Sequence, residues 1–172
     1  MKELRAPLGG EGELSEALAE TAQPLSAAHH VPFSVALEGV PRALHPIVRE
    51  EAYLIASEAI TNAFHHANAN QIDVRLSYGD GAFTVIIRDD GGGFDGGVLS
   101  AGGKPEHWGL VGMRERARRI RAQLTIQSAS DHGTEVQLRL PAEMAYQQRN
   151  GTPRIPWWRR LFPTGGAMTP FV

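Results

Sequence analysis

Two strand–turn–strand patterns, separated by a helical segment, constrain the fold of this chain most strongly. Residues 72–87 alternate between apolar and polar on either side of the turn Gly79-Asp80-Gly81, and residues 124–140 do so around Asp131-His132-Gly133. A period of two is typical of a strand with one buried face. A short glycine-containing turn between two such segments indicates a β-hairpin. We therefore expect two antiparallel hairpins, which cannot belong to an all-helical or purely parallel fold.

Helical periodicity surrounds these hairpins. It runs through residues 13–30, where Pro24 predicts a break or kink, and through 111–121. A strand is expected at 33–39. The longest helix is predicted at 47–67, with an apolar stripe that consists of Val48, Ala52, Ile55, Ala59 and Ala63. The order of elements predicts an α+β fold, a two-layer sandwich in which about three helices cover one face of a mixed, mostly antiparallel sheet of about five strands.

Length and composition indicate one soluble domain. The chain has 172 residues, of which 42% are hydrophobic and 21% charged, a net charge of −2 and no cysteine. Nucleic-acid binding and a membrane span are not expected, because no basic excess and no apolar run of about 20 residues is present. We expect a cytoplasmic location. Residues 1–30 are expected to form a linker and N-terminal helix, 31–142 the domain, and 143–172, rich in proline and tryptophan, a flexible tail.

Glu58, Asn62 and His66 recur at a spacing of four, which places them on one face of the long predicted helix, with His65 beside them. A carboxylate and a carboxamide one turn apart can hold Mg²⁺, directly or through water, because this cation prefers oxygen ligands. The histidines could meet phosphate oxygens. The alternative is an ordinary solvated face of a surface helix.

A second block, Asp89-Asp90-Gly91-Gly92-Gly93-Phe94, follows directly on an apolar strand. An acid held at a strand end could accept a hydrogen bond from the amino group of adenine. The glycines would let the backbone approach a flat ligand closely. The alternative is a flexible acidic turn.

A third block, Gly109 to Ala117, leads into the helix predicted at 111–121. Together with Gly102-Gly103, its glycines could hinge a lid over residues 104–108 whose N–H groups meet phosphates. The arginines of that helix are expected to form a solvated face, with at most one of them near phosphate. Thr134 could help to line a base pocket, although turn chemistry would also explain Gly133-Thr134.

Taken in order, these blocks resemble the ATP-binding domain shared by sensor histidine kinases, DNA gyrase, mismatch-repair ATPases and the ninety-kilodalton heat-shock chaperones. The resemblance covers residues 33–141 and implies a Bergerat-type ATP-binding fold. Asp89-x-Gly91-x-Gly93 resembles the first glycine box of that family and Gly109-x-x-Gly112 the second. The run H-W-G-L-V-G-M-R-E-R-A is most similar to the histidine kinases of the nitrate-sensor class.

The resemblance also implies a role for each site residue, with ATP and Mg²⁺ as cofactors. Asn62 would ligate Mg²⁺, and Glu58 would be the catalytic residue that orients the attacking group or a metal-bound water. Asp89 would bind adenine. The remaining implied ATP-binding residues are His65, His66, Gly91, Gly93, Gly109, Leu110, Gly112, Met113 and Thr134.

Two departures from the family pattern bear on function. His65 stands where the family usually has lysine or arginine, and a mostly neutral imidazole holds phosphate less well. No histidine lies in the context of a phosphoacceptor; the candidates are His29, His30, His45, His107 and His132.

The chain is therefore expected to be the catalytic piece of a larger kinase, which could be the cytoplasmic part of a membrane-bound sensor. Its expected partners are a histidine-containing dimerisation domain, in cis or in trans, and a response regulator. Two alternatives are an anti-sigma-factor-type serine kinase of the same fold and a degenerate module that binds nucleotide without transferring phosphate.

Overall fold

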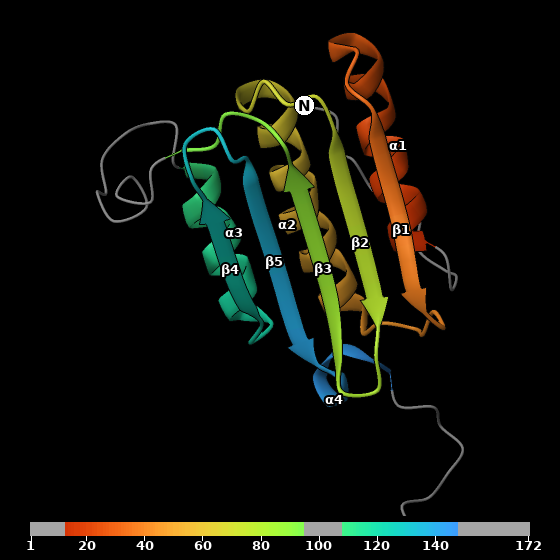
Figure 1. Ribbon diagram of the computed structural model, residues 1–172. Coiled ribbons are helices and arrows are strands. Elements are labelled where there is room, and N and C mark those ends of the chain that lie inside the picture. The colour runs from red at the N-terminus through yellow and green to blue at the C-terminus, as the bar shows by residue number, and fades with distance from the viewer. Residues whose placement is uncertain (1–12, 95–107, 148–172) are drawn as a thin grey trace, which may run out of the picture.

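A computed structural model of the protein describes residues 13–94 and 108–147, which form an α+β sandwich (Figure 1). Helices α1, α2 and α3 cover one face of a five-stranded sheet, and no helix among the described residues covers the other face. The predicted fold class is confirmed. The elements are α1 (Glu13–His29), β1 (Phe33–Gly39), α2 (Pro46–His66), β2 (Ile72–Tyr78), β3 (Ala82–Asp89), α3 (Trp108–Arg119), β4 (Gln123–Ser128), β5 (Thr134–Pro141) and α4 (Ala142–Ala145).

The strands lie in the order β1-β2-β3-β5-β4. β1 pairs in parallel with β2, and the other three pairings are antiparallel, so both predicted hairpins are confirmed. The register of β3 against β5 pairs Asp89 with Thr134. An acid from one hairpin and a threonine from the other are thereby brought together at one end of the central strands.

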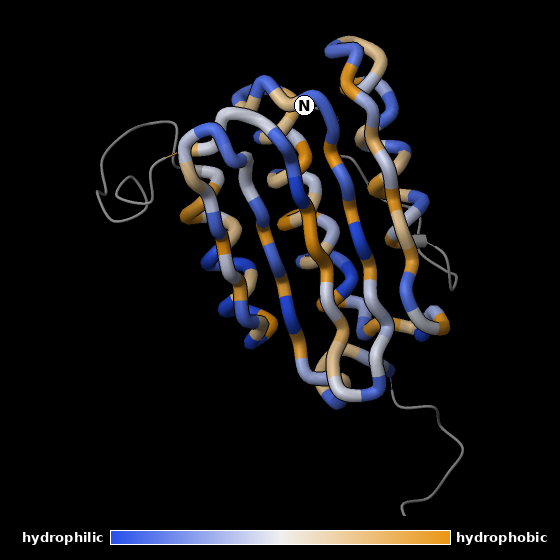
Figure 2. The backbone as a smooth tube through the Cα atoms, viewed as in Figure 1, coloured by the Kyte–Doolittle hydropathy of each residue, from blue (hydrophilic) through white to orange (hydrophobic). Residues whose placement is uncertain are grey.

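The alternation of the strands buries one face of the sheet beneath the helices. Figure 2 shows the alternation as orange and blue positions along β2 and β5. The inward-facing side chains are almost fully buried: Ile72, Val74, Leu76, Phe83, Val85, Ile87, Val136, Leu138 and Leu140. Burying a side chain of this size contributes about 1.5–3 kcal/mol each, before the entropy of ordering it is counted.

Helix α2 lies at the centre of the helical layer. It begins with Pro46, whose fixed φ suits the first turn and whose missing N–H is not needed there. All five residues of the predicted apolar stripe are buried. The helix also buries one acid, Glu51. In residues 13–94 and 108–147, no helix combines the length and apolar character needed to cross a membrane.

Helix α1 continues through Pro24, so the predicted break is wrong. Pro24 is exposed, and water can bond the backbone carbonyl that the proline leaves without an N–H partner. Leu14, Leu18 and Ala22 are buried, and the Thr21 and Tyr53 hydroxyls are 2.9 Å apart and hydrogen-bonded. The first helix is therefore packed onto α2 as part of the same core.

Packed residues continue past position 142, the end of the predicted domain. Ala145 and Tyr146 are buried, and the Tyr146 hydroxyl donates a hydrogen bond of 3.1 Å to the Gly79 carbonyl. The Arg42 guanidinium lies 3.8 Å from the centre of the Tyr146 ring. Together with backbone hydrogen bonds to the segment before α2, this aromatic side chain holds a segment in which no periodic pattern is visible. The remainder of the predicted tail, 148–172, lies outside the described residues.

Candidate functional site

A pocket opens between α2, α3 and the ends of β3, β4 and β5. Its apolar walls include Ile87, Ile126 and Val136, and its polar groups come from both hairpins and from α2. Seven of the predicted site residues line it: Asn62, His66, Asp89, Gly93, Leu110, Met113 and Thr134. The predicted residues Glu58, His65, Gly91, Gly109 and Gly112 lie outside the lining. A mostly apolar cleft with a few converging polar groups is typical of a small-molecule site.

Asp89 is the most deeply buried polar group of the pocket, with 6% of its surface exposed. Its Oδ1 accepts hydrogen bonds from the backbone N–H groups of Gly91 (3.0 Å) and Thr134 (3.3 Å). Burial raises the pKa of the Asp89 carboxyl above its ordinary value, although the hydrogen bonds from Gly91 and Thr134 oppose this rise. The carboxyl is therefore fixed and poorly hydrated, as an acceptor for a ligand amino group should be.

Asp90, the next residue, has a different role. Its exposed carboxylate accepts hydrogen bonds from the backbone N–H groups of Asn70 (2.7 Å) and Gln71 (2.9 Å), which close the loop between α2 and β2. These bonds hold the pKa of Asp90 below its ordinary value, and the bond from Gln71 has the largest effect. Of the two adjacent acids, only Asp89 lines the pocket.

The protein's own backbone requires glycine at two positions after Asp89, namely Gly91 and Gly93. A Cβ on Gly91 would overlap the Ala67 carbonyl at the end of α2, and the Gly92 N–H donates a 2.7 Å hydrogen bond to that same carbonyl. Gly93 has a φ of +60° and lies against the Ala129 and Gly133 carbonyls. The glycine turn therefore joins α2 to both hairpins at the rim of the pocket.

Gly109 and Gly112 lie inside α3, because this helix begins at Trp108, earlier than predicted. Gly109 faces α2, where an added Cβ would overlap Oε1 of Glu58 and would lie 3.4 Å from Nδ2 of Asn62. Tertiary packing thus overrides the poor helix propensity of glycine. Glu58 and Asn62 are half-buried beneath α3, and the alternative of a solvated helix face does not hold for them. The rest of the predicted lid, residues 102–107, lies outside the described residues.

The two histidines at the end of α2 are both exposed. His66 lines the pocket. His65 points elsewhere: its ring centre lies 5.3 Å from that of His29 in α1 and 6.1 Å from that of His66. The two rings are neighbours, but only that of His66 lines the pocket.

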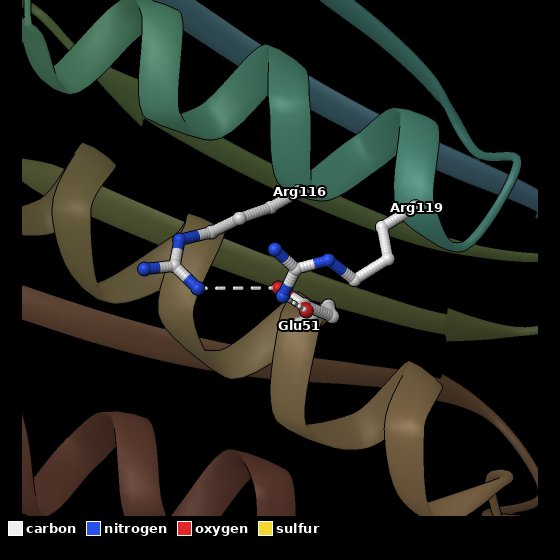
Figure 3. A network of polar contacts seen from close by, with 3 residues as sticks. All are labelled: Glu51, Arg116 and Arg119. Atoms are coloured by element: carbon white, nitrogen blue, oxygen red, sulfur yellow. Dashed lines mark hydrogen bonds and ion pairs between the residues drawn. The ribbon is translucent and has the colours of Figure 1, made fainter.

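Two arginines of the predicted solvated face, the half-buried Arg116 and the exposed Arg119, also contact another helix. Arg116 and Arg119 both pair with Glu51 of α2, at 3.3 Å and 2.6 Å (Figure 3). Sequence reasoning missed Glu51, although an acid on the apolar side of one helix and a basic run on another were both visible. Complementary charges on two helices were the available signal.

In residues 13–94 and 108–147, no group of three or more histidine, aspartate or glutamate side chains could hold a metal ion. The Asn62 amide in the pocket and the nearby Glu58 carboxylate still supply oxygen ligands. Such a pair fits Mg²⁺ that takes its other ligands from water and a nucleotide, since this ion commonly uses one or two protein ligands.

Residues 47–144 match the family described as histidine kinase-, DNA gyrase B-, and HSP90-like ATPase. The chain is 43% identical over 86 residues to the nitrate/nitrite sensor protein NarQ of Escherichia coli, covering 49% of this chain and 14% of NarQ. It is 34% identical over 89 residues to the histidine-protein kinase/phosphatase DegS of Brevibacillus brevis, covering 52% of this chain and 22% of DegS. The match spans less than a quarter of either relative.

Solved structures show the same fold at lower sequence identity. The histidine kinase domain of the Erythrobacter litoralis EL346 blue-light activated histidine kinase superposes with a TM-score of 0.62 and 20% identity, covering 80% of this chain and 67% of that one. The mycobacterial sensor histidine kinase MprB superposes with a TM-score of 0.59 and 15% sequence identity, covering 78% of this chain and 96% of that one. The architecture thus recurs in these two histidine kinases.

Proposed function

Since this chain belongs to the histidine kinase-, DNA gyrase B- and HSP90-like ATPase family, we propose that it is the ATP-binding catalytic domain of a sensor histidine kinase. The family predicted from the three blocks is confirmed. The observation that carries the proposal is the position of Asp89, a buried acid at the base of a pocket whose other side is formed by α2 and α3.

The base of the nucleotide would lie against Asp89. Its carboxylate already accepts two backbone hydrogen bonds at Oδ1 and, when ionised, has lone pairs left for an exocyclic amino group. Ile87, Val136 and Met113 would contact the faces of the ring. Thr134 would help to hold the carboxylate in place, since its N–H is one of the two donors.

The phosphates would lie toward α2 and α3. Asn62 would hold Mg²⁺, and His66, exposed at the pocket's edge, would meet a phosphate oxygen. Mg²⁺, when bound with ATP, neutralises charge on the phosphates during transfer. Glu58, whose carboxylate lies against Gly109, would orient the attacking group.

The proposed reaction transfers the γ-phosphoryl group to a histidine on a dimerisation domain. A ring nitrogen of that histidine forms the new P–N bond, the bond from γ-phosphorus to the β,γ-bridging oxygen breaks, and ADP leaves. The group then passes to a response regulator. Catalysis consists mainly of positioning and charge stabilisation, so the side chains around the pocket have little covalent chemistry to perform.

The test combines the chain with γ-labelled ATP and a separately expressed dimerisation hairpin from one of the similar kinases. Label on the hairpin histidine is expected. Label on a serine of an antagonist protein would support the anti-sigma-factor-type alternative instead. ATP binding without any transfer would support the degenerate module and contradict the kinase proposal.

A further inference from the structure

We propose that Glu51 is a positioning residue for this nucleotide site, acting through Arg116 and Arg119 to hold α3 in place over the pocket. The inference rests on the proposed function and adds to it a residue that does not line the pocket. Figure 3 shows the carboxylate of Glu51 in contact with both guanidinium groups.

Helices α2 and α3 contact each other at two separate places. Toward the N-terminal end of α3, Gly109 lies against Glu58 and near Asn62. Toward its C-terminal end, Arg116 and Arg119 pair with Glu51. Because Glu51 and Glu58 are seven residues, or two turns, apart, they lie on one face of α2, and α3 runs antiparallel along that face.

The part of α3 between these contacts forms a wall of the pocket. Leu110 and Met113 line the pocket, and Met113 is 1% exposed. A shift of α3 by a fraction of a turn would therefore change the shape of the pocket and the position of Gly109 beside Glu58. The ion pairs fix the far end of the helix, so they limit that shift.

Because Glu51 is buried and the two arginines are partly exposed, removing the acid and removing the arginines should affect stability differently. The side chain of Glu51 is 4% exposed, whereas those of Arg116 and Arg119 are 39% and 61% exposed. If Glu51 is removed, both arginines can be hydrated. If both arginines are removed, a buried carboxylate is left without a partner, which is strongly destabilising. Buried apolar contacts from Met113 and Ala117 would still hold α3 on the core after either change.

This asymmetry separates a positioning role from a merely structural one. Glu51→Gln should weaken Mg·ATP binding by about 2- to 30-fold, the range expected when a coupled element loses an anchor, with little loss of stability. Amide hydrogen exchange in residues 108–113 should become faster. The double variant Arg116→Ala/Arg119→Ala should be destabilised and should also bind ATP weakly.

The decisive variant is the triple one, which combines Glu51→Gln with both arginine substitutions. Its stability should return toward that of Glu51→Gln, because no buried charge is left unpaired, while its ATP affinity should stay low. Arg118→Ala, an exposed arginine on the same helix with no ion pair to another described residue, is the matched control and should bind as the unchanged protein does.

Recovery of affinity together with stability in the triple variant would overturn the positioning role, as would unchanged affinity in Glu51→Gln. If the unchanged protein binds no ATP, the proposed function is wrong, whatever the variants show. Hydrogen exchange would then still test whether Glu51 holds α3 in place. Faster exchange at residues 108–113 in Glu51→Gln would support this claim, and unchanged exchange would refute it.

Discussion

Gly109 of α3 lies so close to the carboxylate of Glu58 in α2 that no side chain fits between them. An acid and a glycine from blocks about 50 residues apart in the sequence are thus in contact beside the pocket. The sequence predicts a hinge at Gly109, whereas in the structure its lack of a side chain allows α2 and α3 to approach closely. In the proposed reaction, Glu58 would orient the attacking group from this position.

Gly109→Ala should therefore displace the Glu58 carboxylate without unfolding the protein. The methyl group meets the flexible end of a side chain, and alanine favours a helix over glycine by about 1 kcal/mol. We expect the thermal midpoint to change little and phosphate transfer to the hairpin histidine to fall by roughly 10-fold or more. Transfer at the original rate would contradict the proposed role of Glu58.

Gly112→Ala is the matched control for stability, because no atom of residues 13–94 or 108–147 lies within 4 Å of an added Cβ there, apart from the helix's own backbone and the neighbouring residues. This variant should gain the full helix propensity, about 1 kcal/mol, in chemical denaturation. A loss of stability would show that the space beside Gly112 is not open in solution.

Asp89→Asn should abolish most nucleotide binding without weakening the fold. Burial raises the pKa of the Asp89 carboxyl above its ordinary value of 3.8, so its contribution to stability is full below that value and is lost as the pH rises through the folded-state pKa. At neutral pH the buried charge is a cost, which asparagine removes while its amide oxygen can still accept both backbone hydrogen bonds. ATP affinity should fall about 10- to 100-fold by calorimetry, the loss expected for a hydrogen bond to a charged group.

Asp90→Asn is the control at the neighbouring residue, because the pKa of Asp90 is shifted in the opposite direction from that of Asp89. Hydrogen bonds from Gln71 and Asn70 lower the pKa of Asp90, so its contribution to stability is present above the ordinary value and is lost as the pH falls through the folded-state pKa. We expect a modest loss of stability at neutral pH and unchanged ATP affinity. Equal loss of binding in both variants would contradict the assignment of adenine to Asp89.

Asn62→Ala should remove the part of ATP binding that depends on Mg²⁺ and leave the fold intact. The residue is half-buried and lines the pocket, and its side chain makes no hydrogen bond within residues 13–94 and 108–147. The measurement is calorimetry with and without Mg²⁺. The same Mg²⁺ dependence in the variant and the unchanged protein would count against this ligand.

His65→Lys tests whether the departure from the family pattern weakens phosphate binding. Lysine places a positive charge on a long side chain beside His66, and we expect ATP affinity to rise a few-fold at low salt. The gain should shrink at high ionic strength, because the position is exposed and its charge is screened. No change at low salt would mean that position 65 does not reach the phosphates.

The sequence predicted the fold and the polar base of the pocket well, because both depend on local patterns. Alternation in β3 and β5 specified their inward faces, and the acid at the end of β3 stands out because it directly follows an apolar strand and precedes three glycines. Contacts between distant residues were not predictable in this way. Neither the position of Gly91 against Ala67 nor the pairing of Glu51 with Arg116 follows from a periodicity, since each depends on how two elements approach. The start of α3 was misplaced because glycine propensity argued against a helix that packing stabilises.

The central claim is that the pocket above Asp89 holds Mg·ATP, and calorimetric titration of the protein with Mg·ATP tests it most directly. We predict saturable binding that requires Mg²⁺ for full affinity, with an affinity that falls about 10- to 100-fold in Asp89→Asn and is unchanged in Asp90→Asn. If the folded protein shows no binding at millimolar Mg·ATP in this titration, the account is contradicted.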